Sequence, residues 1–217
     1  WSAGSGTQFE ATSLPGTLRR RWFKIDDFTD NDYTASPVWT IRYNENGLGT
    51  LSAAAGALAM TVTDSPSDFD VDTPVDERDA YGTWEFSLRT QGNPGDTGSA
   101  AYARFIKHGP FGVGYAIVHS VVSGAYQFGR FQGTFVPLLA LTGTVDSSAH
   151  TWRVTRTAAG LFTIYRDGSV VGTYTDTEYT LTSAFGLRST FSQGGSMIAT
   201  IDSIYWSNAV VDIAVAV

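Results

Sequence analysis

Hydrophobic and polar residues alternate along most of this 217-residue chain. In the stretch AYGTWEFSLRT, at 80–90, Trp84, Phe86 and Leu88 are separated by single polar residues. Successive side chains of a β-strand point to opposite faces, so this pattern predicts a strand with one face in a core. The same alternation predicts thirteen strands, at 19–28, 37–43, 56–63, 81–89, 100–107, 113–120, 125–131, 134–141, 150–157, 161–167, 169–175, 184–190 and 197–206.

Turn-forming residues separate these strands, and no segment has a convincing helical period. The pair Asp167-Gly168 supplies the positive φ angles of a type I′ turn, so the strands on either side are expected to form a hairpin. Thirteen short strands are too many for a small barrel. The pattern therefore predicts an all-β domain, a two-sheet antiparallel jelly-roll sandwich.

The two ends of the chain differ from its middle. Residues 1–18 are rich in Gly, Ser and Thr and are interpreted as an arm, and 19–207 as the jelly-roll domain. Residues 208–217 end in an apolar, alternating strand that an exposed edge would make prone to aggregation. This strand is expected to join its own sheet, to begin a following domain, or to be given to a neighbouring subunit.

Composition excludes several classes of function. The formal net charge is −7, which disfavours a nucleic-acid partner. There is no cysteine, so disulfides, thiolate nucleophiles and Cys-ligated zinc are ruled out. No stretch reaches the roughly 18 apolar residues of a membrane-spanning helix. Only 16% of residues are charged, and Thr, Ser, Gly and Ala supply the surface, as in many secreted all-β proteins, so we expect an extracellular, cell-surface or virion location.

Several stretches together resemble the concanavalin A-like (laminin G-like) jelly roll of bacterial and phage surface proteins. They are IDDFTDNDYTASPVWTI, AYGTWEFSLRT, HTWRVTRTAAGLFTIYRDGSVVGTYTD, AFGLRS and IDSIYW, and they cover residues 25 to 206. The resemblance implies a two-sheet sandwich. It leaves the function open, because the superfamily includes lectins, adhesion modules, polysaccharide lyases and glucanases.

Glucanases of this superfamily carry their catalytic carboxylates as Glu-x-Asp-x-Glu on one strand, because residues two apart share a face and can flank one glycosidic bond. The corresponding region here, residues 99–132, has no Asp or Glu. Glu85 lies in a strand similar to a structural one of the glucanases, and we expect it on the solvent side. These features argue against a hydrolase.

Tyrosine, arginine and histidine alternate on the predicted strands 100–107 and 113–120. A lyase would use such residues as a base and to neutralise a substrate carboxylate, but the motifs of alginate-lyase jelly rolls are not recognisable. The same residues suit a sugar site, where rings stack on the sugar and polar groups bind hydroxyls, or they simply fill the core. The candidate ligand-binding residues are Tyr102, Arg104, Tyr115, His119, Tyr126 and Arg130.

The acidic stretch DSPSDFDVDTPVDERD, at 64–79, contains seven carboxylates. Its Asp-x-Asp-x-Asp beginning resembles an EF-hand loop, but Thr73 stands where the turn needs glycine and no helices flank it. We expect a solvated acidic loop, and the alternative is a jelly-roll calcium site. The candidate calcium ligands are Asp68, Asp70, Asp72 and Asp76; no other cofactor is expected.

Three functions follow from these patterns. The first is a non-catalytic extracellular or virion-surface module for recognition or adhesion, with glycans as ligands, inside a larger assembly. The second is a self-assembling subunit of an extracellular filament or viral particle, whose partners are copies of itself or neighbouring structural subunits. The third is a polysaccharide lyase or hydrolase.

Overall fold

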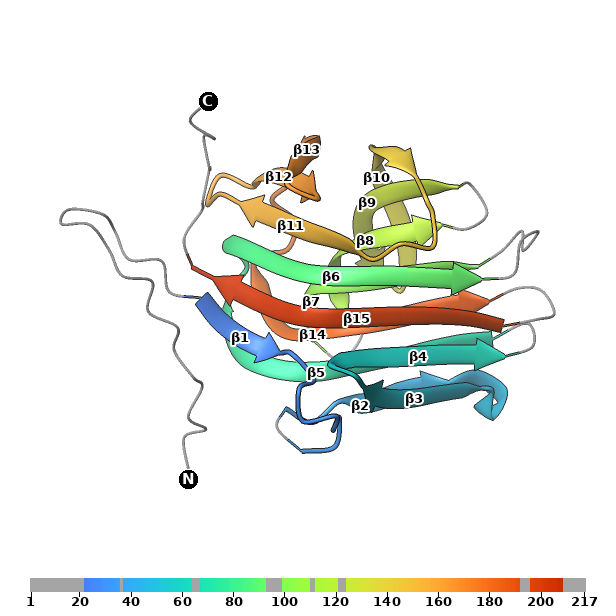
Figure 1. The fold of residues 1–217 in the computed structure, drawn as a ribbon. Coiled ribbons are helices and arrows are strands. Elements are labelled where there is room, and N and C mark those ends of the chain that lie inside the picture. Colours follow the sequence, from blue (N-terminus) through green and yellow to red (C-terminus); the bar gives the residue numbers. More distant parts are fainter. Residues whose placement is uncertain are drawn as a thin grey trace, which may run out of the picture.

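The computed structural model describes residues 22–35, 37–63, 67–92, 99–109, 112–120, 124–191 and 196–208. Within these ranges, fifteen strands and one short 3₁₀ turn (Glu45–Gly47) form two antiparallel sheets that pack face to face (Figure 1). The all-β, two-sheet jelly-roll architecture predicted from the sequence is confirmed.

Sheet A has eight strands and lies in front in Figure 1. In spatial order, seven of them are β13 (Ser169–Thr175), β12 (Leu161–Arg166), β11 (His150–Arg156), β6 (Gly82–Gly92), β15 (Ser196–Ser207), β4 (Ala57–Thr63) and β3 (Gly49–Ala54). The eighth, β1 (Trp22–Asp26), pairs with the second half of β15, next to the part of β15 that pairs with β4.

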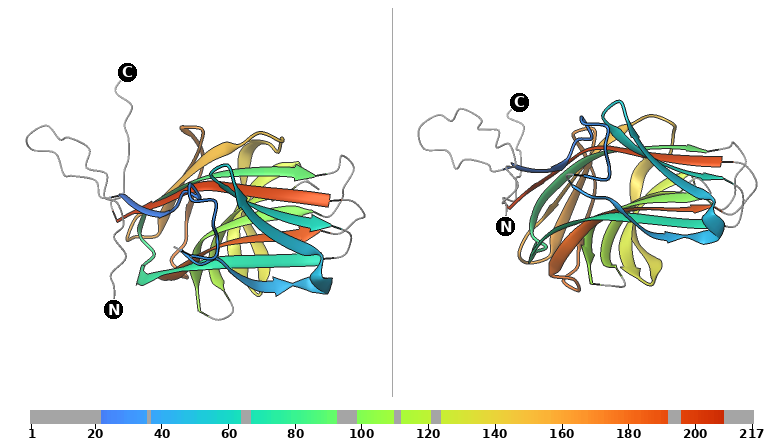
Figure 2. Two further views of the ribbon diagram at one scale, coloured as in Figure 1. Left: turned by 60° about the horizontal axis from the view of Figure 1, so that its bottom comes forward. Right: turned by 90° about the horizontal axis from the view of Figure 1, so that it is seen from below.

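Sheet B has seven strands and forms the second layer of the sandwich, seen edge-on in the turned views of Figure 2. In spatial order they are β10 (Thr134–Thr144), β9 (Ala125–Gln132), β8 (Val113–Ser120), β7 (Ala100–His108), β14 (Leu181–Phe191), β5 (Ser67–Asp79) and β2 (Thr40–Asn44).

The core lies between the sheets. Trp84, Phe86 and Leu88 of β6 point into it and are buried, as the alternation predicted. Glu85 lies on the opposite face, where its Oε2 accepts hydrogen bonds from Nε and Nη2 of Arg153, each at 2.7 Å. Glu85 is therefore the polar, outward residue of a structural strand, as expected.

The hairpin between β12 and β13 is also confirmed. Asp167 has φ 51° and Gly168 has φ 82°, and the strands pair directly on either side. Glycine suits the second position because positive φ strains residues with a Cβ.

The acidic stretch is not a loop, and the expectation of one was wrong. Its described part forms the thirteen-residue strand β5, paired with β14 on one side and β2 on the other. Phe69, Val71 and Thr73 alternate along it and are completely buried. The acidic side chains between them are tolerated because cations on neighbouring strands bind them. Strand β3 was also missed, since its alanines and serine carry little apolar contrast.

Residues 1–18, predicted as an arm, and 209–217 of the predicted terminal strand lie outside the described residues. The division of the chain into arm, domain and terminal strand stays a prediction. Where the chain is described, no helix has the length and apolar character needed to cross a membrane.

Candidate functional site

Charged residues gather on the outer face of sheet B, the face turned away from sheet A. On β5, Asp68, Asp70 and Asp72 occupy alternate positions and therefore share this face. The neighbouring strands β2, β14 and β7 bring cations to the same face. They are Arg42, Arg188, Arg104 and Lys107.

Each of the three carboxylates is bound by a cation. Arg188 donates from Nη2 to Asp68 Oδ2 at 2.5 Å, and Arg104 donates to Asp70. Asp72 accepts from Nε of Arg42 at 2.7 Å with one oxygen, and from Lys107 with the other. Both oxygens of Asp72 are thus occupied by cations.

These ion pairs are unusually sheltered from water. The side chains of Lys107 and Arg104 are 7% and 3% exposed. Burial lowers the pKa of the Lys107 ammonium, and the positive charge of Arg104 lowers it further, while Asp70 and Asp72 oppose the change. Burial also lowers the pKa of Arg104. The cations are held in place by the aspartates because water no longer solvates them fully.

A cleft of about 400 Å³ opens over these pairs, and we call it the charged cleft. Arg42, Asp72, Arg104 and Lys107 line it together with Pro74 and the turn that follows β7. Gly112, in that turn, has φ +62°, and a Cβ there would lie 2.6 Å from Cε of Lys107. An alanine at this position would force the Lys107 side chain to shift from its place beside Asp72.

An aromatic cluster adjoins the charged cleft. The ring of Tyr102 lies 5.3 Å from that of Phe131 and 5.5 Å from that of Phe135, centre to centre. The guanidinium carbons of Arg104 and Arg188 lie 5.3 and 5.4 Å from the centre of Phe131. Burial raises the pKa of the Tyr102 phenol, so it stays a neutral hydrogen-bonding group. This face can stack against a flat apolar ring and bind polar groups beside it.

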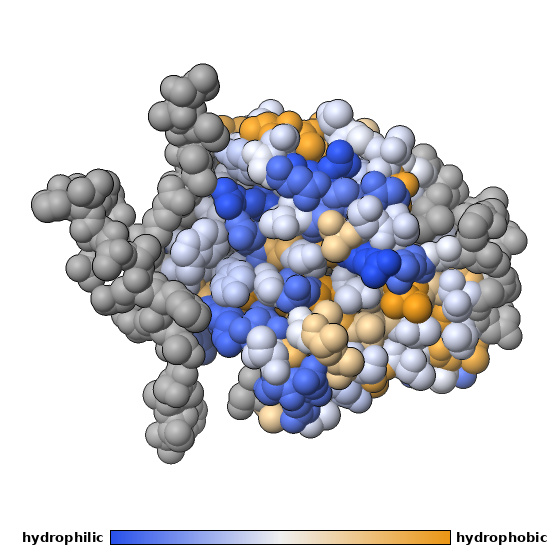
Figure 3. Space-filling view, viewed as in Figure 1, coloured by the Kyte–Doolittle hydropathy of each residue, from blue (hydrophilic) through white to orange (hydrophobic). Residues whose placement is uncertain are grey.

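The outer face of sheet A is different. Polar and charged residues dominate the face turned towards the viewer in Figure 3. The pair of Glu85 and Arg153 lies on this face, with both side chains between a quarter and a third exposed.

The structure does not bring the six predicted ligand-binding residues together. Tyr102 and Arg104 lie on the outer face of sheet B. Tyr115, His119 and Tyr126 face the other way and are completely buried between the sheets. The register of the two strands separates them: Tyr102 pairs with Val118, so His119 falls on the opposite face. Ligand binding by these six residues remains a prediction.

Two of the buried residues form a small polar group inside the core. His119 Nδ1 lies 3.0 Å from the Thr90 hydroxyl, and its ring lies 4.7 Å from that of Tyr126 and 5.6 Å from that of Trp152. Burial lowers the pKa of His119 to about 3. It is a neutral core histidine at ordinary pH.

Tyr115 and Arg130 lie at one end of the core. The Tyr115 hydroxyl donates to Asp176 at 2.8 Å, and burial together with this bond raises its pKa. Arg130, 25% exposed, lies 3.5 Å from Asp176 and 3.7 Å from Glu178. A tyrosine that already donates to a carboxylate is poorly suited to accept a proton from a substrate.

The candidate calcium ligands are not gathered into one site either. Asp68, Asp70 and Asp72 lie along β5, each held by a cation, and Asp76 lines a different groove. Among the residues that the structure describes, no group of three or more His, Cys, Asp or Glu side chains is placed to hold a metal. Calcium binding by these four residues remains a prediction.

Most residues of this face could not be predicted from the sequence. The signal that could have found part of it is the Asp-x-Asp-x-Asp pattern, which alternates with buried Phe69 and Val71 and therefore describes a strand. The partners on other strands carry no comparable signal. The missed residues are Arg42, Lys107, Phe131, Phe135 and Arg188.

Comparison with known proteins supports the fold. No family model and no curated protein sequence matches the chain. A β-1,3-1,4-glucanase (lichenase) from a mouse hindgut metagenome has a similar structure, with a TM-score of 0.65 and 15% identity over 88% of this chain and 99% of that one.

Two similar structures are described as carbohydrate-binding domains. Carbohydrate binding module CBM66 from Bacillus subtilis gives a TM-score of 0.52 and 15% identity, over 73% of this chain and 94% of its own. The potassium-bound carbohydrate recognition domain of Emp46p gives a TM-score of 0.60 and 11% identity. The match covers 87% of this chain and 97% of that domain. Together with the two antiparallel sheets described above, these similarities show that the chain has the jelly-roll sandwich fold.

Proposed function

We propose that the protein is a non-catalytic glycan-binding module whose ligand lies on the outer face of sheet B. The observation that carries the proposal is the aromatic cluster of Tyr102, Phe131 and Phe135 directly beside the charged cleft. A sugar ring has an apolar face that stacks on aromatic rings and hydroxyls that bond to charged groups, which is the combination present here. Arg42, with 52% of its side chain exposed, is the most accessible cation of the cleft.

The similar structures give the proposal a context. CBM66 and the Emp46p domain are described as carbohydrate-binding and carbohydrate-recognising, and the lichenase as a glucanase. At 15% identity or less these similarities concern the fold. The ligand is therefore proposed from the chemistry of the face itself.

The proposal of a non-catalytic role rests on the state of the carboxylates. Asp68, Asp70 and Asp72 have the two-residue spacing that places a pair of carboxylates on one face, as glycoside hydrolysis requires. Hydrolysis also requires one of them to deliver a proton and the other to attack or to activate water. Here each accepts hydrogen bonds from a cation, and Asp72 does so with both oxygens. The hydrolase alternative is supported by the spacing alone.

The proposal includes an extracellular setting, on a cell surface or virion, because polysaccharides and glycoproteins are displayed there. The alternative of a self-assembling structural subunit depends on residues 1–18 and 208–217. Of these only Asn208 is described, so no feature of the outer face of sheet B favours that alternative.

The test is binding of the purified protein to soluble polysaccharides by affinity electrophoresis and calorimetry. We would use mixed-linkage β-glucan, mannan, alginate and polygalacturonate, and we expect retention by at least one. Arg42→Ala and Phe135→Ala should each weaken binding by about 5- to 100-fold, the equivalent of one hydrogen bond to a charged group or one ring contact.

Arg153→Ala, which removes an exposed cation from sheet A, is the matched control and should bind normally. Failure to bind any of these polysaccharides, or equal losses in all three variants, would contradict the proposed site. Release of reducing sugar during incubation would contradict the non-catalytic role.

A further inference from the structure

The charged cleft lies where three neighbouring strands of sheet B lose their regular register. Between Pro74 and Arg78 of β5, three residues stand opposite the single Ser183 of β14, and this bulged serine lines the cleft. On the other side of β14, the pairing with β7 also shifts, between Ala184 and Gly186. Such bulges bend a sheet and redirect its side chains, and they are frequent beside binding sites.

The irregularity in β7 decides which side chains reach the cleft. Arg104 and Lys107 are three positions apart, so a regular strand would place them on opposite faces. Instead, the consecutive residues Phe105 and Ile106 both lie in the core, where the pairing of β7 with β8 shifts. Arg104 and Lys107 therefore both lie on the outer face, where each binds a carboxylate of β5. The bulge adds a second buried cation to the cleft.

The described residues that line the cleft carry a surplus of positive charge. They include three cations, Arg42, Arg104 and Lys107, and two carboxylates, Asp70 and Asp72. The cleft therefore has a local formal charge of +1, although the net charge of the chain is −7. Because Arg104 and Lys107 are buried, water screens this charge less than it would at the surface.

The carboxylates of the cleft are almost saturated, while its cations keep unused donors. Asp72 accepts with both oxygens, and Asp70 accepts from Arg104 with one. Arg42 donates to Asp72 through Nε, and no described residue accepts from its two Nη groups. Lys107 uses one of its three N–H bonds for Asp72. The group that completes the cleft is therefore an acceptor, and a carboxylate supplies two acceptor oxygens together with the opposite charge.

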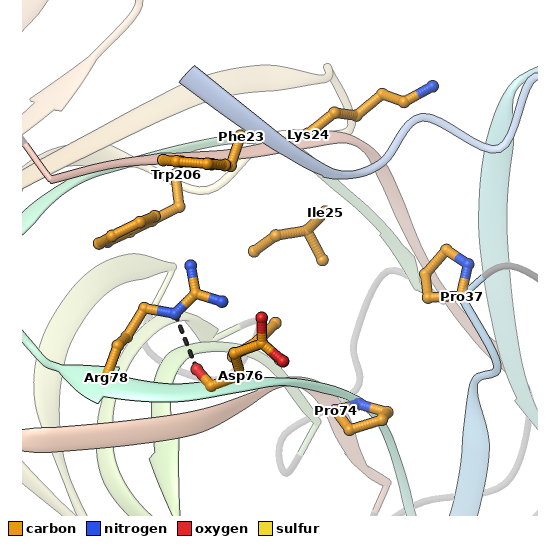
Figure 4. A pocket seen from close by; sticks show the side chains of 9 residues that line it. Phe23, Lys24, Ile25, Pro37, Pro74, Asp76, Arg78 and Trp206 are labelled. Atoms are coloured by element: carbon orange, nitrogen blue, oxygen red, sulfur yellow. Dashed lines mark hydrogen bonds between the residues drawn. The ribbon is translucent and has the colours of Figure 1, made fainter. Parts of the chain in front are cut away.

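A second hollow, on the flank of the sandwich, differs in this respect. It is a groove of about 560 Å³ between β1 and the second half of β5, and we call it the flank groove (Figure 4). The carbon of the Arg78 guanidinium lies 4.3 Å from the centre of the Trp206 ring, and the Asp76 carboxylate stands beside it in the groove. Lys24, which also lines the groove, binds Asp27 at 2.9 Å. Both cations already have a carboxylate at hand, so the flank groove serves as the reference for the charged cleft.

On the basis of the proposed glycan-binding function, we propose that the ligand is acidic, and that a uronic acid residue places its carboxylate in the charged cleft. The Nη groups of Arg42 and the ammonium of Lys107 bind this carboxylate. The fork of an arginine matches a planar carboxylate, to which it donates two parallel hydrogen bonds. Arg104 lines the cleft and also lies against Phe131, so the ring of the same or the next sugar can stack on the aromatic cluster.

The first test compares acidic polysaccharides with their neutral counterparts. Alginate and polygalacturonate are each used before and after chemical reduction of their carboxyl groups to hydroxymethyl groups, which leaves the sugar rings unchanged. By calorimetry, the protein should bind at least one acidic polymer about 10-fold or more tightly than its reduced form.

The outcomes separate this inference from the function on which it rests. Equal affinity for an acidic polymer and its reduced form would overturn the inference and leave the glycan site in place. Binding to mixed-linkage β-glucan or mannan without binding to either acidic polymer would do the same. Binding to none of these polysaccharides would contradict the proposed function as well. Dextran sulfate is anionic and has no carboxylate, and binding as tight as that of the acidic polymer would overturn the assignment to uronic acids.

The second test removes the charge of Arg42 and keeps a hydrogen-bond donor. Arg42→Gln should weaken binding of the acidic polymer by about 10- to 100-fold and change binding of the reduced polymer by less than about 2-fold. Phe135→Ala should weaken binding of both polymers by the same factor, because stacking does not depend on the carboxylate. Arg42 has 52% of its side chain exposed, and Asp72 keeps its bond to Lys107, so the variant should fold normally in a thermal unfolding experiment.

Arg78→Gln, which removes a cation from the flank groove, is the matched control and should bind both polymers as the natural chain does. Equal losses in Arg42→Gln and Arg78→Gln would overturn the proposal. A loss in Arg42→Gln that is the same for the acidic and the reduced polymer would overturn it too, because the arginine would then not bind the carboxylate.

Discussion

Arg104 on β7 reaches across β14 to bond Asp70 on β5, and it passes directly over Gly186. A Cβ at residue 186 would lie 3.3 Å from both Nε and Nη2 of the arginine. The glycine thus leaves the space through which one side chain ties three strands together. This bridge forms the floor of the charged cleft and places Arg104 against the aromatic cluster.

Removing the carboxylate of this bridge should destabilise the fold strongly. In Asp70→Ala, a guanidinium with 3% exposure loses its bound carboxylate, and we expect a loss of about 3 kcal/mol in the free energy of unfolding. Glu85→Ala breaks an ion pair that is more than a quarter exposed and should lose at most about 1 kcal/mol. Urea unfolding of both variants checks the difference. Similar small losses in the two would mean that the cleft ion pairs are not structural.

Gly112 should be needed for the cleft and Gly109 only for its turn. Both have positive φ, +62° and +70°, so alanine strains the backbone at either position by about 1–2 kcal/mol. Alanine at 112 also collides with the Lys107 side chain, whereas nothing lies within 4 Å of a Cβ at 109. Gly112→Ala should therefore unfold at lower urea than Gly109→Ala. Identical midpoints would contradict the tight packing of Lys107.

His119 should make the protein less stable in mild acid. Its pKa is about 3 in the folded state and about 6.5 in the unfolded chain, so the unfolded state binds more protons between these values. Above the unfolded pKa the histidine contributes no pH dependence. As the pH falls from 6.5 towards 3, stability should decrease by about 1.4 kcal/mol per pH unit from this group.

His119→Asn keeps a polar group near Thr90 and does not titrate. Carboxylates also titrate at low pH, so the free energy of unfolding should be measured against pH for both the variant and the natural chain, over pH 4–6.5. The free energy of unfolding of the variant should fall less steeply with decreasing pH. Equal slopes for the two proteins would show that the folded state does not exclude His119 from protonation.

Arg156 should be irreplaceable by lysine. It is completely buried, and its Nη1 donates to the backbone oxygens of Ala80, at 3.1 Å, and of Tyr179, while Nη2 donates to that of Asp176 at 2.9 Å. The single ammonium group of a lysine cannot reproduce these three hydrogen bonds. Arg156→Lys should therefore lower the free energy of unfolding by about 2–4 kcal/mol, because it leaves backbone carbonyls without a donor. Arg153→Lys, on the same strand but exposed, is the control and should change little in thermal unfolding.

The sequence predicts the sandwich because the features that define it are local. The alternation around Trp84 and the turn at Asp167-Gly168 each require information from a few neighbouring residues. β5 was missed because its carboxylates suggested a solvated loop, although the buried Phe69 and Val71 alternate with them.

The site could not be predicted in the same way, because it depends on pairing between distant strands. Asp70 and Arg104 are 34 positions apart, and Asp68 and Arg188 are 120 apart. The alternation within one strand shows that Tyr102 and Arg104 share a face of the sheet. It does not show that His119, on the next strand, lies on the opposite face. That follows from the register of β7 and β8, to which local sequence gives no guide.

The proposed glycan lies across the aromatic cluster and the charged cleft. The most direct measurement is a titration of the ¹⁵N-labelled protein with a polysaccharide fragment that it retains, following backbone and arginine side-chain signals. Binding at this site should shift signals only on the outer face of sheet B, including those of Arg42, Tyr102 and Phe135, and the sugar should be recovered intact. Shifts centred on the Arg153 face of sheet A, or a fragment recovered in pieces, would contradict the proposal.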